Sequence, residues 1–293
     1  MIVYVKLLLT AVFWGGTFIA ARVVTQNVGP FSASFLRFAI ASLFLVSIII
    51  RLEGGLPRLK RHQIIPVILL GMTGVFAYNI FFFLGLKTVT AGRASVIIAM
   101  NPIFIALFAR LLFSERLSRI NVTGILLCVT GALVVISKGN PPALLQGGLE
   151  GGELYILGCV ASWVLYSLIG KHTMQEISPM AAVTYSCLIG GALLFVPACI
   201  EGFLADVAGY RTVDWLGIAY LGFFGSVLGV TWYYQGIKKI GASRAAVFIN
   251  FVPVSAVILA VLLLGETLDI SLITGGGMVI CGAYLTNRKK DGA

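Results

Sequence analysis

Long apolar runs dominate the chain and are separated by short polar segments. Apolar runs of about 20 residues are long enough to cross a lipid bilayer as helices. The runs show no alternation of apolar and polar residues, which excludes membrane β-strands. Ten membrane-spanning helices are predicted, at residues 3–24, 33–51, 64–86, 93–113, 121–137, 153–171, 180–200, 213–236, 244–264 and 271–287. The predicted fold class is therefore an all-α integral membrane protein.

The second half of the chain repeats the first. From Gly85 to Leu117 the matching positions lie 151 residues later, and further upstream the offset is 149. The matching pairs are Gly85 with Gly236, Lys87 with Lys238, Ala91 with Ala242, Arg93 with Arg244, Ala94 with Ala245, Val96 with Val247, Pro102 with Pro253, Glu115 with Glu266, Leu117 with Leu268, Trp14 with Trp163 and Pro30 with Pro179. We therefore expect one repeat unit at residues 1–145 and a second at residues 146–293.

Each unit is expected to hold five helices. Because five is an odd number, the second unit enters the membrane from the opposite face, and the two units are inverted about an axis in the membrane plane. Glu115 is then expected on the cytoplasmic side and its repeat mate Glu266 on the external side. Inverted repeats are the architecture of alternating-access transporters, which bind substrate near the midplane where the repeats meet.

The composition agrees with a membrane location. The chain is 59% hydrophobic and 11% charged, with a mean hydropathy of +1.02, whereas a soluble domain carries about 25% charged residues. The net charge of +10 would suit nucleic acid, but the basic residues lie at the ends of apolar runs and not on a soluble face. The expected partners are the lipid bilayer and a small-molecule substrate, and no nucleic acid.

The distribution of Lys and Arg predicts the orientation. Fifteen of the 21 basic residues fall on one side of the ten helices, and the positive-inside rule makes that side cytoplasmic, with both termini inside. The run from about Val3 to Val24 is too long for the apolar region of a signal peptide and is read as the first membrane helix. Arg37, just inside the second helix, is expected to extend outward to the head groups. The expected location is the bacterial inner membrane.

No cofactor, metal or catalytic centre is expected. The five cysteines all fall in apolar runs without a CxxC pair, which is typical of small buried residues. The chain lacks the GxxxxGK[ST] nucleotide motif, so ATP-driven transport is not expected. All eleven acids, together with His62 and His172, are placed at helix ends or in loops. Buried ionisable groups are the usual functional marks in membranes, and their absence argues against a proton relay.

A recognisable motif occurs in the first and fourth predicted helices. Trp14 lies in mid-helix, and the run from Ala94 to Glu115 contains Asn101 and Pro102; the second copy keeps Pro253 but loses the asparagine. With ten helices in two inverted units, the chain resembles the EamA-type branch of the drug/metabolite transporter superfamily, and within it the YddG-type exporters of aromatic and other amino acids. The resemblance implies transport of small metabolites. Small multidrug-resistance members of the superfamily carry a carboxylate in the first helix, and this chain has none there.

Aromatic residues are the first candidates for a binding site. Trp14 and Trp163 lie in the middle of their helices, although tryptophan usually prefers the membrane interfaces. They can flank a cavity and stack on a planar or cationic substrate, or they can pack tightly at the pseudo-twofold axis. Tyr166 and Ser167 share the face of Trp163 and suit an amino-acid head group.

Amides near mid-depth are further candidates. Asn79 follows Tyr78 in the third helix, and an asparagine at that depth must face protein or a cavity. Asn101 and Asn250 lie near helix breaks and can satisfy freed backbone groups or contact the ligand. The predicted substrate-binding residues are Trp14, Tyr78, Asn79, Asn101, Trp163, Tyr166, Ser167 and Asn250.

Two prolines and two arginines are candidates for hinges and gates. Pro102 and Pro253 stand at the midpoints of two repeat-related helices, where each removes a backbone hydrogen bond and kinks the helix. We interpret them as hinges, with direct binding by a freed carbonyl as the alternative. Arg93 and Arg244 open the same two helices on opposite faces, where a cation opposes the helix dipole. They are predicted gates, with anchoring at head groups as the alternative.

The sequence thus predicts a secondary transporter that exports small metabolites, amino acids including aromatic ones first, by alternating access across the cytoplasmic membrane. The helices at 121–137 and 271–287 are expected at the periphery, where a homodimer contact is possible. The main alternative is proton-driven efflux of drugs or cations. A membrane enzyme acting on a lipid would need a nucleophile, metal cluster or carboxylate pair that the sequence does not offer.

Overall fold

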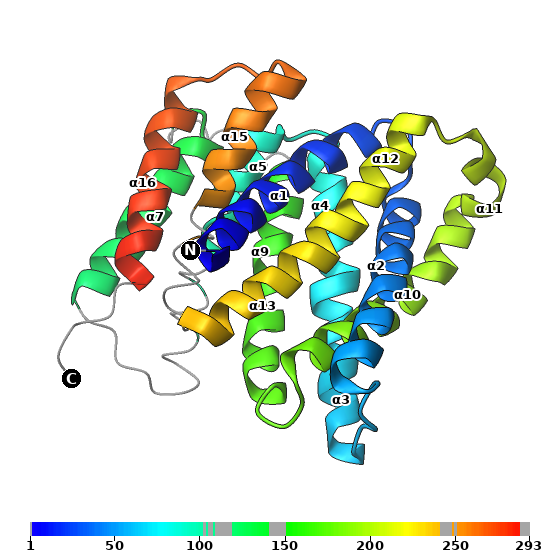
Figure 1. The fold of residues 1–293 in the computed structure, drawn as a ribbon. Helices are drawn as coiled ribbons and strands as arrows, with labels where there is room; N and C mark the ends of the chain where they lie inside the picture. The colour runs from blue at the N-terminus through cyan, green and yellow to red at the C-terminus, as the bar shows by residue number, and fades with distance from the viewer. Residues whose placement is uncertain are drawn as a thin grey trace.

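The computed structural model of the chain describes residues 2–101, 104, 108, 119–140, 151–240, 248 and 251–287. Within these residues all regular secondary structure is helical, as predicted (Figure 1). Several residues singled out from the sequence lie outside the described part of the chain, namely Pro102, Glu115, Leu117, Ala242, Arg244, Ala245, Val247 and Asn250.

The helices follow the apolar runs closely. They are α1 (Ile2–Val24), α2 (Pro30–Glu53), α3 (Arg61–Leu70), η1 (Gly71–Ala77), α4 (Tyr78–Leu86), α5 (Ala91–Ile98), α7 (Arg119–Ile136), α9 (Gly151–Thr173), α10 (Pro179–Glu201), α11 (Phe203–Asp206), η2 (Val207–Gly209), α12 (Thr212–Tyr220), η3 (Leu221–Leu228), α13 (Gly229–Ile240), α15 (Phe251–Leu264) and α16 (Ile270–Asn287). Helix is present in each of the ten predicted ranges.

Six helical stretches are long and apolar enough to cross a membrane. They are Ile2–Val24, Pro30–Glu53, Arg61–Leu86, Gly151–Gly170, Pro179–Glu201 and Thr212–Tyr233. Shorter apolar helices occupy Ile120–Ile136, Phe251–Leu264 and Ile270–Leu285. Large hydrophobic side chains point outward from several of them, including Ile200 and Ile270, which are 83% and 80% exposed. Such a surface suits a lipid environment and not water.

Repeat-related helices α2 and α10 begin and end with the same signals. Each has proline at its first position, which fits the fixed φ angle of the first helical turn. Each is followed by a glycine in the left-handed region, Gly54 with φ 76° and Gly202 with φ 105°, a conformation that glycine adopts without steric cost. The two copies therefore fold this helix in the same way.

Helices α2 and α10 pack against each other in antiparallel directions (Figure 1). The Glu201 carboxylate, at the end of α10, accepts hydrogen bonds of 2.7 Å from both the backbone N–H and the hydroxyl of Ser32, in the first turn of α2. At the opposite end, Glu53 accepts a 2.7 Å hydrogen bond from the hydroxyl of Ser178, the N-cap of α10. Each helix thus meets, at its N-terminus, the carboxylate that ends the other. Gly29 permits this approach, because a Cβ atom there would overlap the Glu201 carboxylate.

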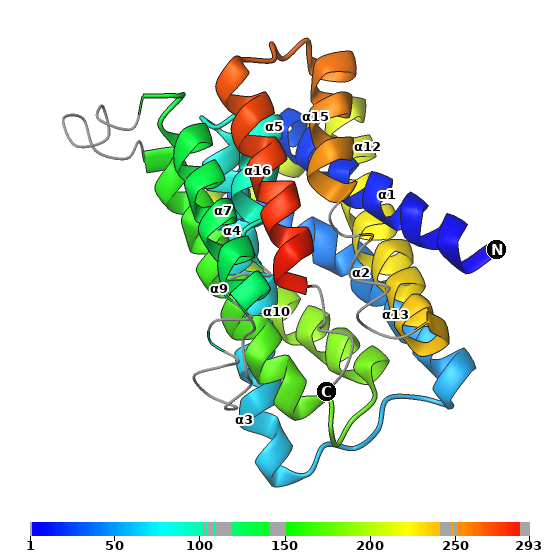
Figure 2. The same ribbon diagram turned by 90° about the vertical axis from the view of Figure 1, so that its left-hand side faces the viewer.

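Helices α7 and α16 form a second antiparallel pair of repeat-related helices, at one edge of the molecule (Figures 1 and 2). Asn121 near the start of α7 donates to the carbonyl of Leu285 near the end of α16, at 3.3 Å. In the middle of the pair, Gly131 and Gly275 lie against each other's carbonyl oxygens, and a Cβ on either would collide with the other backbone. Small residues allow this close approach of membrane helices.

Two membrane-spanning stretches contain a π-helical segment. Segment η1 joins α3 to α4, and η3 joins α12 to α13. Segment η1 begins at Gly71 (Gly71–Ala77) and η3 begins at Leu221 (Leu221–Leu228), whose second residue, Gly222, matches Gly71 at an offset of 151 residues. Gly71 packs against α10, and Gly222 packs against the backbone of α2. π-Helical segments are rare and occur often at functional sites. The region around η1 and η3 is therefore a candidate location for such a site.

The largest cluster of buried hydrophobic residues includes side chains of α1, α4, α5 and α9 and extends to α7, α15 and α16. Phe82 and Phe83 of α4 are almost fully buried in it, and Phe82 makes an edge contact with Phe18 of α1 at 5.2 Å between ring centroids. Residues from both repeat units therefore share one core.

The contact between Gly131 and Gly275 leads to a prediction about stability. Gly275→Leu forces α16 away from α7, and overpacking of this kind costs about 1–3 kcal/mol. We expect a lower melting temperature of the purified protein in detergent. Gly277→Leu is the matched control on the same helix, because nothing lies within 4 Å of its Cβ position. Equal melting temperatures for the two variants would contradict the close packing of this pair.

Candidate functional site

Three aromatic side chains meet between the first and second repeat units. Tyr78, the first residue of α4, lies 5.4 Å from Trp163 of α9 between ring centroids, and Trp163 lies 5.3 Å from Tyr166 one turn further along α9. All three side chains are partly exposed. We call Tyr78, Trp163 and Tyr166 the aromatic wall. The structure therefore brings together three of the residues predicted from the sequence.

The backbone around the aromatic wall holds these rings in place. Gly74 of η1 leaves room for the Tyr166 ring, which occupies the space that a Cβ atom would need. The Cys159 thiol donates to the carbonyl of Tyr78 at 3.5 Å, joining α9 to α4. Ser167 donates its hydroxyl hydrogen to the carbonyl of Trp163 at 2.7 Å. Ser167 can therefore offer a ligand only an acceptor oxygen.

Trp14 has a different environment from its repeat mate Trp163. Its indole N–H donates to the backbone carbonyl of Gly225 in η3 at 2.9 Å. Its ring lies against Gly229, where a Cβ would overlap it, and against Tyr233 at 5.5 Å. Gly229 is the repeat mate of Tyr78, at an offset of 151. Trp14 thus packs into a slot left by a glycine and makes no ring contact with the aromatic wall in the described structure.

Arg37 does not extend outward to the head groups, and that prediction was wrong. Its Nη1 donates to Asn79 Oδ1 at 2.9 Å, and its Nε donates to the hydroxyl oxygen of Ser226 at 3.3 Å. The physical reason is that α4 and η3 place two acceptors beside α2, within reach of the guanidinium. Arg37 therefore links three membrane-spanning stretches in the interior, a role that its position in the sequence did not indicate.

The predicted amides Asn79 and Asn101 differ in how many of their hydrogen-bonding groups have partners. Asn79 accepts from Arg37 and donates to the carbonyl of Val75 at 2.7 Å, so its amide has a partner on both sides. Asn101 is buried, and its Oδ1 has no hydrogen-bond partner within the described residues. A buried acceptor without a partner is costly, which makes Asn101 the amide better suited to receive a donor from a ligand. Pro253 is buried in the first turn of α15.

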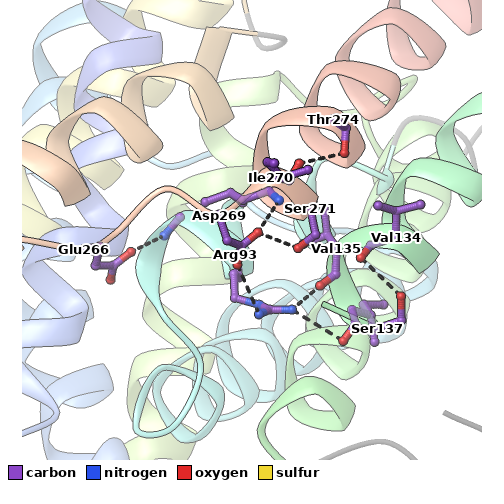
Figure 3. A network of polar contacts seen from close by, with 12 residues as sticks. Arg93, Val134, Val135, Ser137, Glu266, Asp269, Ile270, Ser271 and Thr274 are labelled. Carbon is purple, nitrogen blue, oxygen red and sulfur yellow. Dashed lines mark hydrogen bonds and ion pairs between the residues drawn. The ribbon is translucent and has the colours of Figure 1, made fainter. Parts of the chain in front are cut away.

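Arg93 lies in a polar cluster at the start of α5 (Figure 3). Its guanidinium donates to the carbonyls of Val135 and Ile136 at the end of α7, the latter at 3.4 Å. A cation is favourable at a helix C-terminus, so α7 stabilises a charge that the N-terminus of α5 does not. Its Nη1 also lies 3.9 Å from Asp269 Oδ2, an ion pair with the segment between α15 and α16.

The same segment supplies a carboxylate to the start of α5. Glu266 accepts hydrogen bonds from the backbone N–H groups of Ala91, at 2.8 Å, and Gly92, at 3.1 Å (Figure 3). Asp269 caps α16 by accepting from the Leu272 N–H and the Ser271 hydroxyl. The hydrogen bond from the Ser271 hydroxyl is the main cause that holds the pKa of Asp269 below its ordinary value. An ionised Asp269 is available to pair with Arg93.

A second polar cluster joins the ends of helices from both units. Glu176, after α9, is 2.6 Å from His62 Nε2 and accepts from Gln63 at 2.8 Å. The hydrogen bond with His62 is the main cause that lowers the pKa of Glu176, and the hydrogen bond from Gln63 adds to it. A surface hollow of about 430 Å³ opens beside this cluster, lined by residues 53–57 and 176–178.

Among the described residues, no group of three or more His, Cys, Asp and Glu side chains could hold a metal ion. Cys159, Cys187, Cys199 and Cys281 are free thiols. The site is therefore built from aromatic rings, amides, hydroxyls and one guanidinium.

Known proteins are similar to this chain over nearly its whole length. The sequence profile of the EamA-like transporter family matches residues 1–137 and 150–288. The uncharacterized transporter YyaM of Bacillus subtilis is 31% identical over 280 residues, which cover 96% of this chain and 92% of that protein. A probable terminal-alkyne amino-acid exporter of Streptantibioticus cattleyicolor is 27% identical, with 98% and 93% covered.

Two further similarities agree with these. The uncharacterized inner membrane transporter YedA of Escherichia coli is 27% identical and covers 88% of this chain and 81% of its own. One solved crystal structure superposes with a TM-score of 0.66 at 22% identity, covering 96% of each chain. At that identity the structure shows a shared fold.

The role of Glu266 as a cap for α5 is testable. Glu266→Ala leaves the N–H groups of Ala91 and Gly92 without their acceptor, and loss of an N-terminal cap costs about 1 kcal/mol. We expect a lower melting temperature in detergent. Asp206→Ala is the control, because Asp206 is exposed and makes no recorded side-chain hydrogen bond. If both variants melt like the wild type, Glu266 does not stabilise α5.

Proposed function

The chain belongs to the EamA-like transporter family, and from this premise we propose that it is a secondary transporter that exports amino acids, aromatic ones included, by alternating access. The family and the relatives are transporters and not enzymes, and the chain is a multi-pass membrane protein. We place it in the bacterial inner membrane with both termini in the cytoplasm, because most of the basic residues fall on the side of the termini.

The aromatic wall is the observation that carries the proposal. Tyr78 belongs to the first unit, while Trp163 and Tyr166 belong to the second. A planar substrate that stacks on these rings would therefore contact both units at once, as alternating access around a shared site requires. Aromatic pairs favour offset or edge contacts that a substrate ring can extend. The similarity to a probable amino-acid exporter supports amino acids as the substrate class.

The proposed architecture is ten helices in two inverted units, at residues 1–145 and 146–293. Two antiparallel pairs of repeat-related helices, α2 with α10 and α7 with α16, support the inversion. Units related by an axis along the membrane normal would instead keep such helices parallel. The two segments matched by the family profile support the division into units.

The proposed gates and hinges follow from the same inversion. The cluster of Arg93, Glu266 and Asp269 ties the start of α5 to the segment before α16, and we propose that it closes the external end. Arg244 would act at the cytoplasmic end, with Pro102 and Pro253 as hinges between the two states. The paired α7 and α16 lie at one edge of the molecule, away from the aromatic wall, and offer a surface for a homodimer.

Transport by a Trp163 variant tests the proposal. In proteoliposomes, wild-type protein should carry labelled phenylalanine, and Trp163→Ala should lower that flux about tenfold by removing the central ring of the wall, because the loss of a ring contact of about 1.4 kcal/mol is a factor of 10. Leu165→Ala is the matched control, since Leu165 lies on the outer face of α9 and is 51% exposed.

Three outcomes separate the alternatives. No flux of any amino acid through well-folded protein would contradict the proposed substrate. Normal flux through Trp163→Ala would remove the aromatic wall from the path. Flux of flat cations driven by an imposed pH gradient would favour the alternative, proton-coupled drug or cation efflux.

A further inference from the structure

The guanidinium of Arg37 lies inside the helix bundle with neutral partners. Its Nη1 and Nε bind the oxygens of Asn79 and Ser226. No carboxylate forms an ion pair with Arg37 within the part of the chain that the structure describes. A cation at this position therefore has hydrogen bonds but no recorded counter-charge.

The two π-helical segments fix the acceptors that face Arg37. The Asn79 amide nitrogen donates to the carbonyl of Val75 in η1, so its oxygen turns toward the guanidinium. The Ser226 hydroxyl donates to the carbonyl of Leu221, at 3.2 Å within η3, so its lone pairs turn the same way. Both acceptors are held by carbonyls of a π-helical segment. The guanidinium is therefore held in a defined orientation.

One edge of the guanidinium remains available. Its Nη2 lies toward Gly225, 3.8 Å from where a Cβ would stand, and has no recorded hydrogen-bond partner among the described residues. The Gly225 carbonyl already receives the indole N–H of Trp14. Arg37 is partly exposed, although its neighbours Leu36 and Phe38 on α2 are buried. This edge can therefore still donate to a further acceptor.

The energetic balance favours an anionic ligand. A charged side chain at depth in a membrane helix costs about 2.5–3.5 kcal/mol on insertion scales, and hydrogen bonds to neutral groups offset only part of that cost. The free Nη2 can donate a charge-assisted hydrogen bond to a carboxylate oxygen, which is stronger than a hydrogen bond to a neutral acceptor.

The Arg37 edge is close to the aromatic wall. Asn79, which binds Arg37, directly follows Tyr78 of the aromatic wall in α4. A cation beside an aromatic surface suits a molecule that carries a carboxylate near a ring. We propose that Arg37 binds the carboxylate of the transported substrate, an inference that rests on the proposed function for the identity of that substrate as an aromatic amino acid.

Ligand-induced stabilisation of the full chain in detergent tests this inference. The probes are phenylalanine, phenylalaninamide, which keeps the ring and ammonium but lacks the carboxylate, and benzoate, which keeps the ring and carboxylate. Phenylalanine and benzoate should raise the melting temperature of the wild type, and phenylalaninamide should require at least a tenfold higher concentration. In Arg37→Gln the affinity for both carboxylates should fall at least tenfold, to that of the amide.

A second variant guards against misfolding of the first. Asn79→Asp places a carboxylate 2.9 Å from Arg37, which should compete with the ligand and weaken binding of phenylalanine, and the melting transition without ligand shows that this variant is folded. Arg51→Gln is the control for loss of a positive charge, because Arg51 is exposed at the end of α2.

The outcomes distinguish this inference from the proposed function. Wild-type affinity for phenylalanine in both Arg37→Gln and Asn79→Asp would overturn the carboxylate site and leave amino-acid transport intact. Arg37-dependent binding of benzoate without binding of any amino acid would overturn the proposed substrate and retain the site. Stabilisation by none of the probes would overturn both.

Discussion

The ends of helices α2 and α10 hold one another through carboxylates, and the rest of the arrangement depends on this contact. Near a membrane the first N–H groups of a helix must find acceptors within the protein or at its surface. Glu201 supplies acceptors for the start of α2, and Glu53 binds the N-cap hydroxyl of α10. Both contacts exist only if the two helices run in opposite directions with their ends in register. Glu266 serves the start of α5 in the same way, again from the other half of the chain.

With the halves joined at their ends, the middle of the bundle can differ between the two copies. The π-helical segments η1 and η3 occupy matching positions, yet Tyr78 follows one segment and Gly229 follows the other. Tyr78 therefore meets Trp163, while Gly229 admits Trp14 against the backbone of η3. Trp14 packs between α1 and η3, whereas its repeat mate Trp163 contacts the rings of Tyr78 and Tyr166; both tryptophans are partly exposed. This difference between Tyr78 and Gly229 places the proposed binding surface in one half of the bundle.

Much of the fold could be predicted because apolar length and repeat offset are properties of the chain itself. Outside the predicted helices 93–113 and 244–264, each of which has one limit beyond the described residues, the predicted helix limits lie within a few residues of those in the structure, and Tyr78, Trp163 and Tyr166 do meet. The sequence could not reveal that Arg37 turns inward, because its partners lie 42 and 189 residues away. The binding of Trp14 to Gly225 and the start of η1 at Gly71 likewise depend on contacts between distant helices. Glycines at such positions signal close approach without saying which helix approaches.

Topology at one repeat-related pair of positions tests the proposed inversion most directly. Leu56, after α2, and Ala205, after α10, are repeat mates at an offset of 149. In a protein without its native cysteines, Leu56→Cys and Ala205→Cys can each be labelled with a membrane-impermeant maleimide. The account predicts that only Ala205→Cys is labelled in intact cells and that Leu56→Cys reacts after permeabilisation. Labelling of both positions from the same side of the membrane would contradict it.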